Sequence, residues 1–172
     1  MKVKIICDTR EQSNFHILES LKKNEIDYEV KKVNYGDYEM YAPEIDYTCS
    51  LRVERKASIS EIAGNLLEPK DENGLNRFAR ELAKAKELGI KLVIMIEENA
   101  NENWYEDILK HRYRSGLKPK SLRGILMSLC SKYDVHIVGI PKEYAGSYIY
   151  NILSYHMRQE LKSLKKEGVI ND

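Results

Sequence analysis

The spacing of apolar positions along the chain predicts a mixture of strands and helices. Alternating or continuous apolar runs of strand length indicate six strands, and apolar residues spaced three or four apart indicate six helices. The expected strands are 2–7, 28–33, 36–42, 47–56, 90–97 and 135–140. The expected helices are 15–24, 59–67, 75–89, 102–113, 119–133 and 142–166.

The order of these elements predicts the fold class. Ser58 is a candidate N-cap for the helix that begins near Ile59, and Gly89 is a candidate stop for the helix before it. The first strands cluster, and the later ones alternate with helices. We therefore expect an α/β protein in which a mixed central sheet carries helices on both faces. A chain of 172 residues suits a single domain, 1–172, with the long helix 142–166 near its end.

Composition excludes several classes of protein. The three cysteines, Cys7, Cys49 and Cys130, are scattered and odd in number, which predicts a reduced, intracellular (cytoplasmic) protein rather than a disulfide framework. No apolar run approaches the length of a membrane span, so no membrane partner is expected. The net charge of +1 gives no general signal for nucleic-acid binding. The histidines His16, His111, His136 and His156 show no catalytic spacing and are expected to be structural or on the surface.

Charged residues interrupt the apolar pattern at the end of the predicted strand 47–56. Alternate side chains of a strand share a face, so Glu54 and Lys56 point one way while Arg55 points the other. A carboxylate can hold a divalent cation, and an adjacent lysine can orient water or stabilise negative charge on a phosphate. Asp37 opens the preceding strand after Gly36 and can supply a second carboxylate at the same sheet end. Oxygen ligands of this kind favour Mg²⁺ or Mn²⁺.

Three short motifs follow one another in the chain: "DTRE" at 8–11, "GDY" at 36–38 and "VERK" at 53–56. In this order they resemble the nuclease domain of the XPF-type structure-specific endonucleases, which include the Mus-type and archaeal Hef-type enzymes. The resemblance extends over nearly the whole chain. It implies a restriction-endonuclease-like core and metal-dependent cleavage of DNA with Mg²⁺ or Mn²⁺, at flaps, forks or other junctions between single and double strands.

The resemblance also implies roles for individual residues. Asp8, Asp37 and Glu54 would be metal-site carboxylates, Lys56 the catalytic lysine, and Arg10 a catalytic cation facing a phosphate. The role of Glu11 in the motif is less defined. Because Arg55 lies on the opposite strand face, we expect it to pack under the site against a carboxylate.

The segment after the lysine resembles the short, single-domain members encoded by bacteriophages and mobile elements, which commonly end the next helix in "AGNL", here 63–66. Where the family usually has an aspartate, this chain has Ser60, followed by Glu61, which we expect to point elsewhere on the helix. The acidic shell is therefore expected to be weakened or redistributed. Longer members grip branched DNA with a tandem helix–hairpin–helix module, and we do not expect such a module within residues 1–172.

DNA contacts are expected within this domain. Six cations and no acid occupy the basic segment, defined as residues 110–123: Lys110, Arg112, Arg114, Lys118, Lys120 and Arg123. Such a strip can bind phosphates, and Tyr113 could stack on an unpaired base. Arg77 and Arg80, which follow the 71–74 loop, are weaker candidates. The alternative for the basic segment is a solvated junction between two helices.

The last helix carries more apolar surface than one core requires. Its large side chains include Tyr144, Tyr148, Ile149, Tyr150, Ile152, Leu153, Tyr155 and Met157. Family nuclease domains commonly dimerise through core helices, so a homodimer that uses this helix is expected. The alternative is a helix buried in its own domain.

Two other functions remain open from the sequence. One is a catalytically weak or inactive relative that serves as a DNA-binding or dimer-partner module; Glu54 and Lys56 argue against it, whereas Ser60 keeps it open. The other is an unrelated phosphohydrolase with Asp8 as the nucleophile, which would usually have a second aspartate where Arg10 stands.

Overall fold

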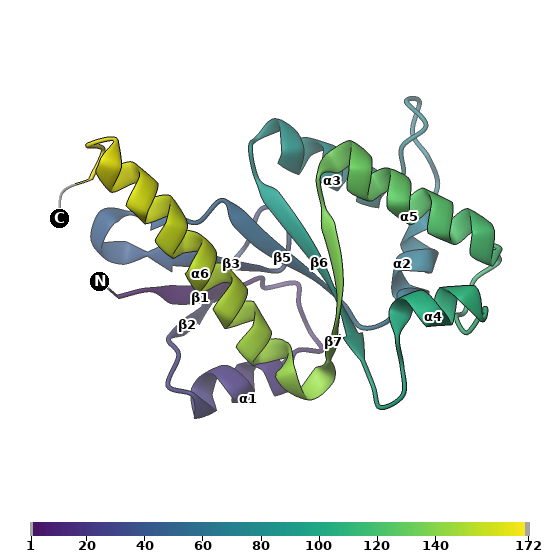
Figure 1. The fold of residues 1–172 in the computed structure, drawn as a ribbon, viewed down its shortest axis with the longest axis horizontal. Coiled ribbons are helices and arrows are strands. Elements are labelled where there is room, and N and C mark those ends of the chain that lie inside the picture. Colours follow the sequence, from purple (N-terminus) through teal and green to yellow (C-terminus); the bar gives the residue numbers. More distant parts are fainter. Residues whose placement is uncertain (1, 171–172) are drawn as a thin grey trace. The chain divides into compact units, whose positions relative to one another are not determined.

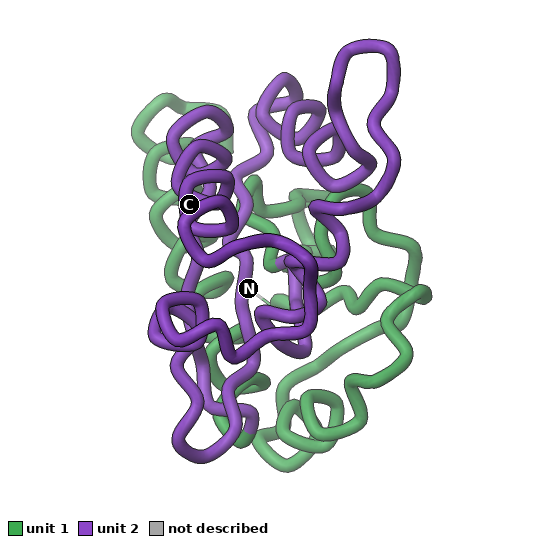
Figure 2. Tube along the Cα trace, turned by 90° about the vertical axis from the view of Figure 1, so that its right-hand side faces the viewer, with its two compact units in different colours: residues 1–53, 143–172 green, residues 54–142 purple. Residues whose placement is uncertain are grey.

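Two groups of segments, each with its own internal packing, make up the chain. The computed structural model describes residues 2–170. Unit 1 comprises residues 1–53 and 143–172, and unit 2 comprises residues 54–142 (Figure 2). The division falls inside one strand, between Val53 and Glu54.

The strands form a seven-stranded mixed sheet in an α/β arrangement, as predicted. Its order is β2-β1-β3-β5-β6-β7, with β4 paired to β3. β1 and β2 are parallel, β3 is antiparallel to both β1 and β5, and β6 and β7 are parallel. The strand bounds are β1 Lys4–Cys7, β2 Tyr28–Val30, β3 Tyr38–Ala42, β4 Tyr47–Thr48, β5 Leu51–Lys56, β6 Lys91–Glu98 and β7 His136–Pro141.

Six α-helices and two short 3₁₀ helices accompany the described strands. The α-helices are α1 Phe15–Lys23, α2 Ile59–Leu66, α3 Arg77–Glu87, α4 Trp104–Leu109, α5 Pro119–Tyr133 and α6 Ala145–Lys166. The 3₁₀ helices are η1 Pro43–Ile45 and η2 Lys142–Tyr144. Ser58 caps α2 as predicted, because its side chain accepts a hydrogen bond from the Glu61 amide. Within residues 2–170, no helix combines the length and the apolarity needed to cross a membrane.

In unit 1, α6 packs against α1 and β3 (Figure 1). The buried positions of α6 include Ala145, Ile149, Leu153, Met157 and Leu161, which are four residues apart and form one apolar stripe. Gly146 lies at the crossing with α1, where a Cβ atom would come within 2.6 Å of the Ser20 Cβ. The absence of a side chain at Gly146 therefore allows the two helices to approach closely.

In unit 2, the hydrophobic core lies around β6. Leu92, Val93, Ile94, Met95 and Ile96 are all buried, so the continuous apolar run correctly predicted a strand covered on both faces. α3 packs on β6, and α2, α4 and α5 pack among the helices of this unit (Figure 1).

Several predicted bounds differ from those observed. The expected strand 47–56 divides into β4 and β5, because Ser50 turns its amide away from the ladder to the Glu160 carboxylate of α6. The expected helix 102–113 ends at Leu109, and His111 adopts a left-handed backbone with φ of 54°. The first residues of the expected helix 142–166 form η2, and the α-helix begins at Ala145.

Candidate functional site

Asp8 follows β1 and anchors the turn after it. The residue is 1% exposed. Its Oδ1 accepts hydrogen bonds from the Arg10 amide at 2.7 Å and from Arg10 Nε at 2.9 Å. Its Oδ2 accepts from Arg10 Nη2 at 2.9 Å and from the Val33 amide at 2.8 Å. Burial alone would raise the pKa of this carboxyl, but these hydrogen bonds outweigh it and lower the pKa below its ordinary value. Asp8 is therefore an ionised, fully engaged carboxylate.

Four hydrogen bonds reach the two oxygens of Asp8, and the roles of this residue as a metal ligand or as a nucleophile stay predictions. Its observed task is to hold Arg10. The Arg10 side chain is 64% exposed despite the ion pair, so its guanidinium still faces solvent where a phosphate could approach. The amide of Glu11 donates to the Asp8 carbonyl at 3.1 Å and closes the turn, which gives this motif residue a backbone role.

Asp37 is fixed through its backbone between two strands. Its amide donates to the Val53 carbonyl of β5 at 2.8 Å, and its carbonyl accepts from the Asp8 amide at 2.8 Å. The chain enters this position through Gly36, whose φ of 90° lies in the left-handed region that favours glycine. The Gly36–Asp37 pair thus places Asp37 beside Val53, which directly precedes Glu54 in the chain. The Asp37 residue is partly exposed.

Lys56 ends β5 and lies in a shielded, acidic environment within unit 2. The residue is 7% exposed. Its Nζ lies 2.9 Å from Glu54 Oε1, 3.5 Å from Glu61 Oε1 and 5.2 Å from the centre of the Phe78 ring. Two carboxylates and an aromatic face together stabilise the charged amine that burial would otherwise disfavour. The prediction that Glu54 and Lys56 share a face of the strand is confirmed by their ion pair.

The expectation that Glu61 points away from the Glu54–Lys56 pair is wrong. Its Oε2 accepts a hydrogen bond from the Ala57 amide at 2.8 Å, while its Oε1 lies near Lys56. Ser58 and Glu61 have the spacing of a helix capping box, in which the glutamate turns back toward the start of its helix. That pattern could have revealed the contact. Ser60 accepts a hydrogen bond from the Arg114 amide at 2.9 Å, so it anchors the basic segment rather than the acidic shell.

Arg55 packs against a carboxylate, as predicted. Its Nε and Nη2 donate to Glu97 Oε1 and Oε2 at 2.7 and 2.9 Å, which makes a bidentate pair between β5 and β6. The side chains are only 5% and 3% exposed. Glu97 lies within the apolar run of β6 and had no sequence signal of its own.

The basic segment divides into paired and unpaired cations. Lys110 forms an ion pair with Glu106, and Arg112 lies 3.2 Å from Glu106 and 2.7 Å from Asp107. Acids on α4, just before the segment, therefore offset the charge of these two residues. The other four cations form no salt bridge within residues 2–170: Arg114, Lys118, Lys120 and Arg123. These four are the better candidates for contact with phosphates.

Tyr113 does not present its ring for stacking, which corrects the prediction for this residue. It is 8% exposed, and its hydroxyl donates to the Leu117 carbonyl at 2.6 Å. Its ring also lies against His111, with centroids 4.9 Å apart. Tyr113 thus packs inside the loop that carries the cations.

The remaining predicted contacts, Arg77 and Arg80, are also engaged by acids. Arg77 lies 3.3 Å from both Glu68 and Glu81, and Arg80 lies 3.2 Å from Asp71. Hydrogen bonding from Arg77 lowers the pKa of Glu68, so the pair is charged at neutral pH. Neither arginine offers an uncompensated charge to DNA.

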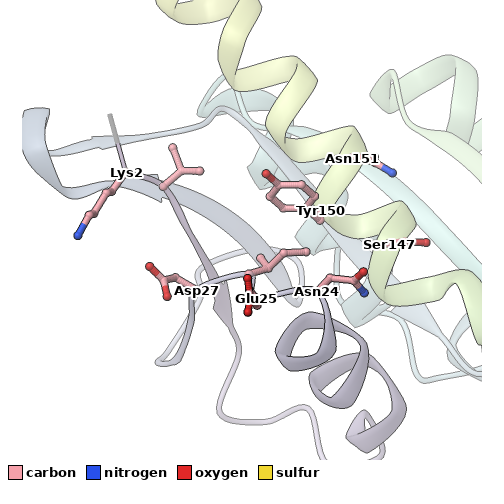
Figure 3. A pocket seen from close by; sticks show the side chains of 9 residues that line it. Lys2, Asn24, Glu25, Asp27, Ser147, Tyr150 and Asn151 are labelled. Atoms are coloured by element: carbon pink, nitrogen blue, oxygen red, sulfur yellow. The ribbon is translucent and has the colours of Figure 1, made fainter.

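A surface pocket of about 440 Å³ in unit 1 contains none of the predicted site residues (Figure 3). It lies among the start of β1, the α1–β2 turn and α6. Asp27 and Glu25 lie below Lys2 and Tyr150 in this view. The mixture of charges around it does not resemble a phosphate-binding surface.

Comparison with known proteins gives a consistent result. Residues 7–152 match the sequence model of the ERCC4 domain. Among solved structures, XPF from Aeropyrum pernix matches with a TM-score of 0.62 and 18% identity, over 95% of this chain and 69% of that one. The same protein in complex with DNA matches with a TM-score of 0.61 and 18% identity, over 92% and 66% of the two chains. A search of curated protein sequences found no match.

Proposed function

Since this chain belongs to the ERCC4 domain family and is an XPF-type nuclease domain, we propose that it is a metal-dependent DNA endonuclease that cuts at flaps, forks or related junctions. The observation that carries the proposal is the buried Lys56 amine, 2.9 Å from the Glu54 carboxylate at the end of β5. A shielded lysine beside a carboxylate is costly to the fold and suited to acting on a phosphate.

The donor set fits a hard divalent cation. We assign Asp37 and Glu54 as the carboxylates for Mg²⁺ or Mn²⁺, with Asp8, whose oxygens accept hydrogen bonds from Arg10 and Val33, as a further candidate. When bound, the cation would lower the pKa of a water molecule and offset negative charge on the phosphate.

The chain's own residues do the remaining work of the proposed mechanism. Lys56 stabilises the negative charge that develops on the phosphate, and ion pairs with Glu54 and Glu61 limit the motion of its amine. Arg10, held by Asp8, contacts a phosphate of the bound strand.

A panel of labelled DNAs tests the proposed function. We expect cleavage of flap or fork substrates with Mg²⁺ or Mn²⁺, and much slower cleavage of single strands and plain duplexes. Loss of cleavage on removal of metal by a chelator, with recovery on adding it back, is the control. Binding without cleavage under all metal conditions would instead favour the inactive DNA-binding module.

For DNA contact, we propose the unpaired cations of the basic segment. Replacing Arg114, Lys118 and Lys120 with alanine should weaken binding across sequences and reduce the salt dependence by about 0.9 log–log units per lost contact with duplex. The matched control is Arg112→Ala, because Glu106 and Asp107 already offset that charge. Titrations at several salt concentrations measure both quantities. Equal effects of Arg112 and Arg114 substitutions would contradict this assignment.

We also propose a homodimer that uses α6. Tyr144, directly before this helix, and Tyr155, on it, are 59% and 62% exposed and lie outside the stripe that packs in unit 1. Light scattering should give about twice the chain mass of 20.1 kDa. Tyr144→Glu together with Tyr155→Glu should then yield a folded monomer, whereas an exposed control on α3 such as Lys84→Glu should not. A wild-type monomer at high concentration would rule out this interface.

A further inference from the structure

A cysteine, a histidine and a glutamate from distant segments meet within unit 1. Cys49 lies between β4 and β5, and His156 and Glu160 lie one turn apart on α6. One ligand atom of each lies within 4.8 Å of the other two. We propose that these three residues, the Cys49 cluster, bind one divalent cation that favours sulfur and nitrogen ligands, with Zn²⁺ as the expected ion.

The geometry is close to that of a tetrahedral site. Zinc bonds of about 2.0–2.3 Å place neighbouring ligand atoms roughly 3.3–3.8 Å apart. His156 Nε2 and Glu160 Oε1 are already 3.3 Å apart. Their spacing of four residues on a helix directs both side chains to the same side. A shift of about 1 Å by the Cys49 side chain would bring its sulfur to the same spacing.

Neighbouring polar groups hold the Glu160 carboxylate in place. It accepts hydrogen bonds from the Ser50 amide at 3.2 and 3.3 Å, from the Ser50 hydroxyl, and from the Tyr47 hydroxyl at 3.1 Å. Tyr47 and Ser50 flank Cys49 in the sequence, so one short segment supplies a ligand and the groups that orient another ligand. Metal ligands in proteins are commonly oriented in this way.

Charge and access also suit a cation. The Cys49 thiol is fully buried and lies 4.0 Å from the Leu153 carbonyl. On binding, the S–H bond breaks, a sulfur–metal bond forms and the proton leaves to solvent. The thiolate and the Glu160 carboxylate then balance the two positive charges. The His156 and Glu160 side chains are 24% and 18% exposed, which provides an entry path and room for water as the fourth ligand.

This cluster differs in chemistry from the carboxylates assigned to Mg²⁺ or Mn²⁺. Sulfur and imidazole ligands select softer cations, whereas Asp37 and Glu54 offer oxygen alone. The inference is independent of the proposed nuclease activity. It predicts a cation that joins the β4–β5 junction to α6 and strengthens the packing of unit 1.

Cobalt is a spectroscopic probe for this cluster. Titration of the reduced, full-length chain with Co²⁺ should give a thiolate-to-cobalt absorption band and the visible bands of tetrahedral cobalt, with an amplitude that corresponds to one equivalent. Zn²⁺ should displace the cobalt and raise the Tm of the chain. The thiolate band should vanish in Cys49→Ser and persist in Cys130→Ser, the matched control from unit 2.

A second variant covers the case in which Cys49→Ser does not fold. His156→Gln changes a partly exposed helix residue and should weaken cobalt binding at least about tenfold while circular dichroism stays unchanged. A wild-type chain without a thiolate band, or an unchanged band in a folded Cys49→Ser or His156→Gln variant, would overturn the inference. DNA cleavage is not a readout, so the outcome is separate from that of the nuclease proposal.

Discussion

Lys56→Ala is expected to reduce the single-turnover rate of DNA cleavage by a factor of about 10² or more. The amine is buried and held 2.9 Å from Glu54, so no other cation of the β5 motif can take its place without rearrangement. In the proposed mechanism it stabilises charge that is present mainly in the transition state. DNA affinity should change little, because one cation among many is removed.

Measurements on Glu54→Gln separate metal binding by Glu54 from the stabilisation of phosphate charge by Lys56. That variant should lose both cleavage and Mn²⁺ binding by calorimetry, whereas Lys56→Ala should keep metal binding. Lys84→Ala is the matched control, since Lys84 also forms an ion pair, 2.7 Å from Glu87, but is 54% exposed on α3. A Lys56→Ala protein that cleaves at the wild-type rate would reduce the Glu54–Lys56 pair to a structural contact.

Arg55→Met is expected to lower the free energy of unfolding by about 3–5 kcal/mol, because it leaves the Glu97 carboxylate charged and uncompensated inside unit 2. Denaturant unfolding monitored by circular dichroism measures the loss. The double variant Arg55→Met, Glu97→Leu should recover most of it, since no buried charge then remains. Lys84→Ala, which breaks an exposed pair, should cost no more than about 1 kcal/mol. A small loss in the single variant would show that solvent reaches this pair.

Most of the helices and strands were predicted from the local spacing of apolar residues. The two-residue period of β5 was enough to place Arg55 opposite Glu54 and Lys56, and to predict that Arg55 meets a carboxylate. It could not name Glu97, because the partner lies 42 residues away in the chain and depends on strand pairing. Likewise, the motif order identified Asp37, but only the structure shows its backbone bonded to Asp8, directly after β1, and to Val53 of β5.

The wrong interpretations have a common physical cause. The contacts of these residues could not be deduced from the short segment in which they lie. The basic segment contains no acid of its own, so its sequence did not separate Lys110 and Arg112, which pair with acids of the preceding helix α4, from the other cations. Tyr113 was expected to stack on an unpaired base because it lies among the cations of the basic segment, yet its hydroxyl donates to the Leu117 carbonyl within the same loop.

The discontinuity of unit 1 sets an order in which the chain can fold during synthesis. Unit 2 is a single stretch, 54–142, and can form its contacts as soon as that stretch has left the ribosome. Unit 1 needs α6, because Glu160 bonds to Ser50 across 110 residues and α6 packs on α1 and β3. The early strands must therefore wait for the late helix, and such distant contacts form slowly. During that interval α6 does not yet cover β3. Rapid folding or a chaperone must then protect β1 and β3 from association with other chains.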